Sequence, residues 1–285
     1  MILVLGATGR VGAEVVRLLV AQGTPVRCMA RDPQRAAGMA AAGIEVVRGD
    51  LDDPGSLHNA FDGIEQLFLM SPVGERMAAQ QLAAVAAARI AGVARIVKLS
   101  GSSWTMQDGA ETVSGAAHAE VEKAIRACAI AHVFLRPNVF MQGMLARLPL
   151  ELAAGDTFTL ALGDAAAAFI DARDIAAVAT RCLGAAAIPA ETLDLSGPAA
   201  VSGGDIAEIA GALTGRAITY QPVPSGTALS AARARGESAF VLRHLAQVLD
   251  RIALGAASAT SAGVAALCGR PAHSVATWLG ATLRH

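Results

Sequence analysis

Short apolar runs alternate with amphipathic segments through the first half of the chain. The apolar runs predict strands at residues 1–5, 25–30, 44–47, 66–70, 95–100 and 132–136. The amphipathic segments predict helices at residues 10–22, 33–42, 54–61, 75–91 and 113–128. Short strands separated by helices of roughly 10–15 residues are typical of βαβ units. The pattern therefore predicts an α/β fold with a parallel sheet.

The pattern is less regular after residue 136. We expect a helix at residues 138–153, short strands at 158–161 and 169–170, a helix at 171–183 and a strand at 192–195. Ser202 or Gly203 then begins a helix that ends at Thr214, a strand follows at 218–221, and helices fill the remainder. We predict a sheet domain at residues 1–150 and a mixed region at residues 151–285. The mixed region would return to the sheet at about 156–200 and form a smaller, mainly helical lobe at about 201–285.

Glycines follow the first predicted strand at intervals of three residues. They are Gly6, Gly9 and Gly12, and Thr8, Arg10 and Val11 lie between them. Between a strand and a helix, such glycines allow a tight turn, close approach of the backbone to a pyrophosphate, and close helix packing. The helix N-terminus then favours the phosphates. The run predicts the first turn of a doubly wound, Rossmann-type dinucleotide-binding domain, and the helical lobe would hold the substrate.

The end of the second predicted strand bears on the choice of cofactor. Arg31 follows this strand and Asp32 comes next. An acidic residue here binds the ribose hydroxyls of NAD, whereas an arginine can pair with the additional phosphate of NADP. Since Arg10 could supply a second positive charge, we predict NADP(H) in preference to NAD(H). The alternative is that Arg31 is solvated and Asp32 caps the helix that begins at Pro33.

Several segments together resemble the NmrA-like group of atypical short-chain dehydrogenase/reductases. They are the glycine run and residues 49–51, 95–100, 135–138, 171–176 and 260–278, so the resemblance covers almost the whole chain. That group includes quinone-reductase-like and triphenylmethane-reductase-like enzymes as well as redox-sensing regulators. The resemblance therefore implies either a reductase or a nucleotide sensor.

The resemblance also implies which residues contact the cofactor. It puts Asp50 and Leu51 at the adenine, and Met70, Ser71 and Pro72 beside the ribose and pyrophosphate. It puts Ser100, Gly101, Pro137 and Asn138 near the nicotinamide. For Asp50 a turn, and for Pro137 the end of a strand, are alternative explanations.

The proton donor of the wider superfamily, a Tyr-x-x-x-Lys pair, is absent at its usual place. The one tyrosine, Tyr220, lies far downstream, and His118 and Glu122 stand at the start of the predicted helix 113–128. Their spacing of four residues puts both on one helical face. His118 could be a general acid, because its ordinary pKa lies near neutrality, or it could only bind the cofactor or a backbone carbonyl. We expect Glu122 to be solvated or helix-pairing, and Lys123 is one position out of register.

Apolar side chains follow the fifth and sixth predicted strands. They are Trp104, Phe140, Met141 and Met144, and Tyr220 could join them from the second lobe as substrate contacts. Such residues are more often part of a core. An iminium ion, a cationic dye or a quinone accepts hydride without simultaneous protonation. We therefore predict an NADPH-dependent reductase of imine, iminium, quinone-like or cationic acceptors; the alternatives are a non-catalytic NADP-sensing regulator and an epimerase.

Composition and charge exclude other classes. The chain is 54% hydrophobic and 16% charged with a net charge of −1, which argues against disorder and against nucleic-acid binding. The uncharged stretch at residues 252–269 is rich in Ala, Gly, Ser and Thr, so we do not expect it to span a membrane. The 4 cysteines have no metal-ligand spacing. We expect a cytoplasmic protein with an apolar or cationic small-molecule substrate, no metal, no nucleic acid and no membrane partner; a homodimer is compatible with this.

Overall fold

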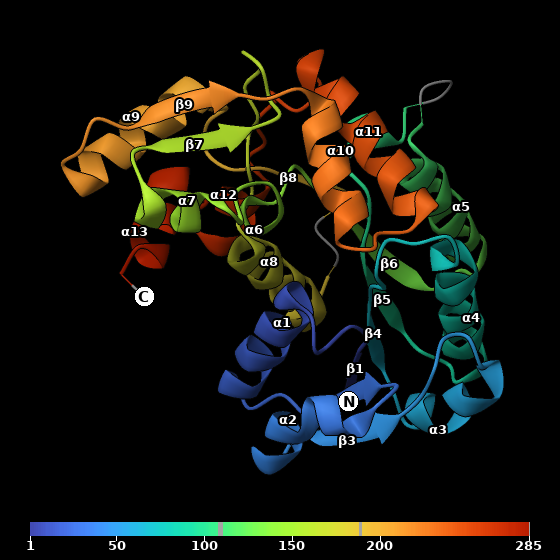
Figure 1. Cartoon of the computed structure of the whole chain (residues 1–285). Helices are drawn as coiled ribbons and strands as arrows, with labels where there is room; N and C mark the ends of the chain where they lie inside the picture. Colours follow the sequence, from blue (N-terminus) through green and yellow to red (C-terminus); the bar gives the residue numbers. More distant parts are fainter. Residues whose placement is uncertain (108–110, 188–189, 285) are drawn as a thin grey trace. The chain divides into compact units, whose positions relative to one another are not determined.

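The computed structural model describes residues 1–107, 111–187 and 190–284 and divides the chain into two compact units (Figure 1). Unit 1 consists of Met1–Gly101, Ser114–Arg136 and Ile175–Leu193. Unit 2 consists of Ser102–Val113, Pro137–Asp174 and Asp194–His285. Segments of the two units therefore alternate along the chain, and the division is more interleaved than one boundary at residue 150.

Unit 1 is built on a seven-stranded sheet in the order β3-β2-β1-β4-β5-β6-β8. The strands are β1 (Ile2–Val4), β2 (Val26–Ala30), β3 (Glu45–Arg48), β4 (Gln66–Leu69), β5 (Arg95–Leu99), β6 (Ala131–Pro137) and β8 (Thr192–Leu195). Neighbouring strands run parallel, with Ile2 opposite both Val26 and Gln66. The chain order reverses direction at β1 and β4, as in doubly wound sheets. The predicted α/β fold is confirmed.

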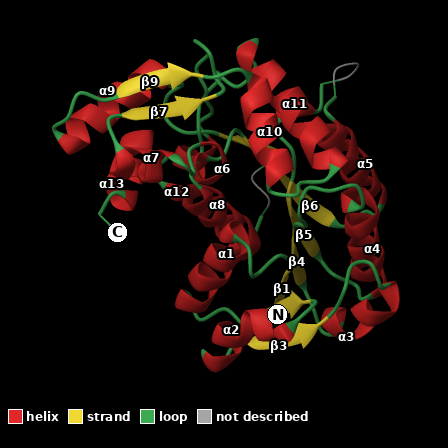
Figure 2. Ribbon diagram, viewed as in Figure 1, coloured by secondary structure: helices red, strands yellow, loops and turns green. Residues whose placement is uncertain are grey.

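Helices cover both faces of this sheet. They are α1 (Arg10–Ala21), α2 (Ala37–Ala41), α3 (Leu57–Phe61), α4 (Met77–Ile90), α5 (Val113–Ala127) and α8 (Ala172–Gly184), with 3₁₀ turns at Pro33–Ala36 and Pro54–Ser56. Figure 2 shows α1 and α8 on one side of the strands and α4 and α5 on the other. Strand residues such as Leu67 and Phe134 pack against Val85 of α4 and Val121 of α5. Both faces are covered, which explains why these strands read as continuous apolar runs.

Unit 2 contains a two-stranded parallel sheet and several helices. Its elements are a 3₁₀ turn at Ser103–Thr105, α6 (Met141–Met144), α7 (Leu148–Ala154), β7 (Thr157–Leu160), α9 (Gly203–Thr214), β9 (Thr219–Pro222), α10 (Ser225–Ala234), α11 (Ala239–Ala253), α12 (Gly263–Cys268) and α13 (Val275–Thr282). Phe158, Ile206, Ile252 and Leu279 are part of its buried core. Ser202 caps α9 in a reciprocal arrangement with Asp205, so the predicted start of this helix is confirmed.

Two local predictions are wrong. The expected single helix at 138–153 is divided into α6 and α7, because Pro149 lies in the first turn of α7, where proline starts a helix rather than continuing one. The expected strand at 169–170 is only an isolated bridge between Phe140 and Ile170. Among the described residues, no helix is both long enough and apolar enough to cross a bilayer.

Candidate functional site

The turn after β1 requires glycine at two of its three glycine positions. Gly6 has a φ of +67°, and a Cβ atom there would lie 2.8 Å from Cγ of Met70. A Cβ atom at Gly12 would run into the carbonyl oxygen of Gly6. The Gly9 amide donates to that same carbonyl over 2.9 Å, which closes the turn. Gly6 and Gly12 thus each have a steric reason, whereas a Cβ atom at Gly9 would only make a tight contact of 3.2 Å with the Gly6 carbonyl oxygen.

The N-terminus of α1 is directed out of this turn. Its N-cap is Gly9, and within the described residues no side chain caps the helix and no acidic residue lies in its first turn. Thr8 and Arg10 are exposed beside it, whereas the side chain of Val11 packs into the core. An uncapped helix of 12 residues with a basic side chain at its start favours an anionic group. These features fit the diphosphate of a dinucleotide.

At the end of β2, Arg31 is exposed and its side chain forms no ion pair or hydrogen bond with any residue that the structure describes. The carboxylate of Asp32 accepts a hydrogen bond from Gln34 N over 3.0 Å and caps the following 3₁₀ turn. Asp32 therefore has the capping role that the sequence offered as an alternative. Arg48 on β3 is the register partner of Ala30, so it adds a second exposed arginine to this edge. Sequence reasoning missed it because strand register cannot be read from spacing.

The segments after β3 and β4 hold the other predicted cofactor contacts of unit 1. Asp50 closes a turn, since its Oδ1 accepts from Asp52 N over 3.0 Å. Leu51 packs against the unit 1 core, and Met70 lies under Gly6. Ser71 accepts a hydrogen bond from Gln81 over 3.1 Å, and Pro72 is exposed. Because β4 neighbours β1, residues 70–72 begin beside the glycine turn.

A network of buried polar side chains occupies the space between β5, α5 and β6. Lys98 of β5 is completely buried, and its Nζ lies 2.8 Å from Nδ1 of His118 and 3.0 Å from Oγ of Ser100. Ser100 donates to Oε1 of Glu122 over 2.6 Å. Arg136 of β6 donates to the same carboxylate through Nε over 3.1 Å. The network brings together Lys98, Ser100, His118, Glu122 and Arg136.

The burial of this network changes its ionisation. Burial lowers the pKa of Lys98 to about 7, the charge of Glu122 opposes this change, and the charge of Arg136 reinforces it. Burial acts to raise the pKa of Glu122, but hydrogen bonds from Arg136 and Ser100 together with nearby positive charge bring it below its usual value. Glu122 is therefore a carboxylate near neutral pH. Lys98 changes its charge there, which is unusual for a lysine.

One sequence expectation needs correction at this point, and one contact was missed. Glu122 is not solvated, because its side chain is 1% exposed and pairs with Arg136. Its pair with Arg126 one helical turn away confirms the helix-pairing alternative. The lysine that meets His118 comes from β5, whereas Lys123 is exposed. The sequence did contain a signal for this contact, since Lys98 is a charged residue inside the apolar run 95–99. Buried ions are rare unless they have partners, so a partner for Lys98 could have been sought.

The predicted residues of unit 2 form a hydrogen-bonded and packed group of their own. Trp104 Nε1 donates to Oδ1 of Asn138 over 3.2 Å, and Nδ2 of Asn138 donates to the Ala257 carbonyl over 2.9 Å. The Pro137 carbonyl accepts from Ser102. Asn138 thus has its side chain committed to the structure of unit 2.

The apolar residues proposed as substrate contacts differ in their accessibility. Met141 is fully buried in the unit 2 core, whereas Phe140 and Met144 are half-buried. Tyr220 lies in β9, where its hydroxyl donates to the Gly163 carbonyl over 3.0 Å, and its ring packs on Phe158. Burial raises the pKa of this tyrosine. Tyr220 is therefore fixed between β7 and β9 in unit 2.

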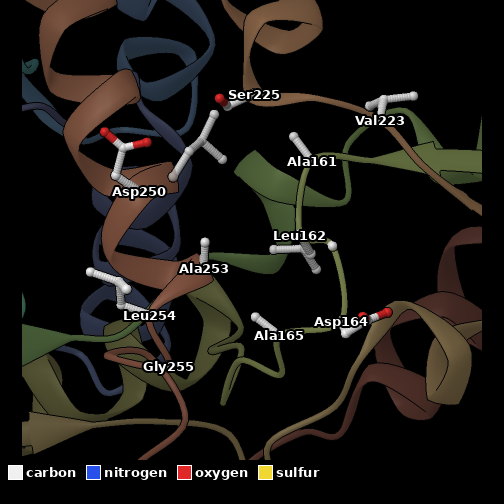
Figure 3. A pocket seen from close by; sticks show the side chains of 12 residues that line it. Ala161, Leu162, Asp164, Ala165, Val223, Ser225, Asp250, Ala253, Leu254 and Gly255 are labelled. Carbon is white, nitrogen blue, oxygen red and sulfur yellow. The ribbon is translucent and has the colours of Figure 1, made fainter.

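Unit 2 also contains an open cavity of about 630 Å³ between the segment after β7, the start of α10 and the end of α11 (Figure 3). Most of its lining is apolar, including Leu162, Ala253 and Leu254. Asp164 and Asp250 add two carboxylates, and neither forms an ion pair with a described residue. Its volume is within the usual range for small-molecule sites.

Comparison with known proteins decides the family. The sequence matches the model of the NmrA-like family over residues 1–261. The chain belongs to the NmrA-like family. This NmrA-like chain is 32% identical over 220 residues to an NAD(P)H azoreductase of Xenophilus azovorans, covering 77% of the chain and 76% of the relative. It is 33% identical over 278 residues to a (4-alkanoyl-5-oxo-2,5-dihydrofuran-3-yl)methyl phosphate reductase of Streptomyces griseus, covering 98% and 96%.

A solved structure agrees with this assignment. The NADPH complex of the NADPH-dependent quinone oxidoreductase QOR2 from Escherichia coli superposes with a TM-score of 0.85 and is 27% identical in sequence. The comparison covers 100% of this chain and 99% of that one. The suspected family and the Rossmann-type fold are thus confirmed.

Proposed function

We propose that this NmrA-like oxidoreductase uses NADPH to transfer hydride to an electrophilic small molecule of the imine, iminium, quinone-like or cationic type. The observation that carries the proposal is the glycine-rich turn at the uncapped N-terminus of α1. The relatives add support, since their names describe NAD(P)H-dependent reductases of azo and quinone compounds. In this proposal the bound nicotinamide supplies the hydride, and the protein supplies position and electrostatics.

The cofactor would be held mainly by backbone and by a few side chains. The run Gly6–Gly12 would bind the diphosphate, and Arg31 would pair with the additional phosphate that distinguishes NADP from NAD. The unpaired state of Arg31 supports this preference. Further proposed contacts are Asp50, Leu51, Met70, Ser71, Pro72, Ser100, Gly101, Pro137 and Asn138.

The acceptor would be an apolar, electrophilic molecule, and the iminium and dye-like acceptors would also carry a positive charge. Trp104, Phe140 and Met144 retain some exposure and are the most accessible of the proposed substrate contacts, whereas Met141 is fully buried and the Tyr220 hydroxyl is bonded to the Gly163 carbonyl. None of these residues lines the cavity of unit 2, which is a separate candidate for a cation with an apolar body, because two carboxylates without an ion pair stand there among apolar side chains. We propose His118 as the residue that handles a proton when the acceptor needs one.

A non-catalytic NADP sensor is the second candidate, favoured by the missing Tyr-x-x-x-Lys pair. A panel of quinones, iminium salts and cationic dyes, followed by NADPH absorbance, separates the two functions. The enzyme consumes NADPH with at least one acceptor class, whereas a sensor binds the cofactor and consumes none.

Gly9→Val is the matched control for that panel. Gly9 is the N-cap of α1, so a branched side chain there would stand where the helix N-terminus would receive the diphosphate. Calorimetry should detect no NADPH binding to a folded Gly9→Val protein. Wild-type affinity in this variant would refute the dinucleotide site itself.

A further inference from the structure

The environment of the buried Lys98 ammonium is unusual. Its Nζ lies near His118 Nδ1, Ser100 Oγ and the Leu99 carbonyl, at 2.8, 3.0 and 3.5 Å. Within the described residues, Lys98 forms no ion pair with a carboxylate, since Ser100 stands between it and Glu122. The strongest base in direct contact with this ammonium is therefore an imidazole.

Two nitrogen bases at this distance share one bridging proton. When Lys98 is charged, it donates to Nδ1, so the neutral imidazole must carry its own proton on Nε2. When Lys98 is neutral, the bridging proton belongs to Nδ1 instead. The charged groups around the pair are Glu122 of α5, which favours the ammonium, and Arg136 of β6, which disfavours it. The pKa of about 7 for Lys98 lies close to the ordinary value of histidine, so the proton can move in either direction.

We propose that Lys98 and His118 form a proton relay that completes the reduction of quinone-like acceptors. Hydride addition to a quinone leaves a hydroquinone monoanion, which needs one proton. His118 gives that proton from Nε2 while Lys98 passes its own proton to Nδ1; a proton from solvent then binds Nε2, and Nδ1 returns its proton to the buried Lys98. This inference rests on the proposed reductase function. In it Lys98 is a positioning residue that acts through His118.

The relay performs the task of the missing tyrosine and lysine with residues from different elements. The acid comes from α5 and its cationic neighbour from β5, so no i,i+4 motif exists to be found. A preformed iminium cation needs hydride alone and gains nothing from the relay. The relay therefore predicts that Lys98 matters for one acceptor class and not for the other.

The first test uses the cofactor-free full chain. We would follow the imidazole nitrogens by ¹⁵N NMR against pH, with His118→Asn to assign the signal. Wild-type His118 should carry its proton on Nε2 below about pH 7 and change towards Nδ1 above it. In Lys98→Met this change should vanish. An unchanged His118 titration in Lys98→Met, or no such change in the wild type, overturns the relay without any enzyme assay.

The second test compares two acceptors in the same variants. With a quinone, Lys98→Met should lower kcat by about 10²-fold, in the range of general acid–base contributions. With a permanently charged iminium salt, kcat of Lys98→Met should stay within about 3-fold of the wild-type value. Lys123→Met, at the other lysine of the chain, should leave kcat unchanged with both acceptors. Equal losses with both acceptors indicate a structural role and overturn the relay, as does no loss with either. No NADPH consumption by the wild type with any acceptor refutes the proposed function instead, and the NMR result is unaffected.

Discussion

Replacement of Lys98 by methionine tests the buried ammonium through protein stability. The substitution keeps a long, unbranched side chain and removes the charge. In the folded protein the pKa of Lys98 is about 7, whereas its ordinary value is 10.5. Between these values the unfolded chain binds a proton that the folded chain does not, so the free energy of unfolding rises with pH. Below about pH 7 both states are charged, and the full cost of burial is present.

The size of the effect follows from the difference between the two pKa values. Lys98 is 0% exposed, so solvent does not screen its charge. Across the interval between the two pKa values, the free energy of unfolding changes by roughly 5 kcal/mol, with a greatest slope of about 1.4 kcal/mol per pH unit. From about pH 7 to 9 the free energy of unfolding of the wild type should therefore rise by about 2–3 kcal/mol relative to that of Lys98→Met.

Urea unfolding of both proteins at several pH values measures this difference. Burial raises the pKa of Cys28 to about 11, which lowers stability at high pH, but this effect is common to both proteins and cancels in the difference. Lys123→Met, at an exposed lysine, is the control and should follow the wild type. Parallel stability curves for the wild type and Lys98→Met would mean that Lys98 keeps an ordinary pKa, and the electrostatic argument would then be wrong.

Three further substitutions test the cofactor and acceptor assignments. Arg31→Ala should weaken NADPH binding by about 10- to 150-fold and NADH binding little, because one charge-assisted contact is lost; equal weakening of both in calorimetry would contradict the phosphate contact. His118→Ala should lower kcat by less than about 10²-fold with a permanently charged iminium acceptor at saturating NADPH, and a greater loss would make His118 essential to hydride transfer itself. Asp250→Asn should raise KM for a cationic acceptor by about 2- to 5-fold and leave a neutral quinone unaffected; equal KM changes would exclude the cavity carboxylate as a cation contact.

Most of the fold of unit 1 could be predicted because local rules decide it. Central strands such as β1 and β4 are buried on both faces and appear as apolar runs, and a glycine follows each of the helices α1 to α4. The prediction was wrong at residues 138–153, where apolar content continues but Pro149 starts a new helix. The glycine turn was also readable, because the local backbone and Met70 require glycine at positions 6 and 12.

The polar network could not be predicted in the same way. His118 and Glu122 were visible as a pair on one helix, but Lys98 and Arg136 meet them only through the packing of α5 on the sheet. Such contacts join residues 14 or 20 positions apart on different elements, and spacing rules do not reach them. The expectation that Glu122 is solvated was wrong because it followed the usual exposure of glutamates, whereas Glu122 is buried.

The most direct test of the central claim follows the hydride itself. NADPH deuterated at the transferable C4 position would be mixed with the protein and a permanently charged iminium acceptor, and the product would be analysed by mass spectrometry. We expect a product that carries one deuterium on its former iminium carbon, formed by the wild type and not by Gly9→Val. Tight binding of NADPH with no deuterium transferred to this or any quinone acceptor would contradict this expectation.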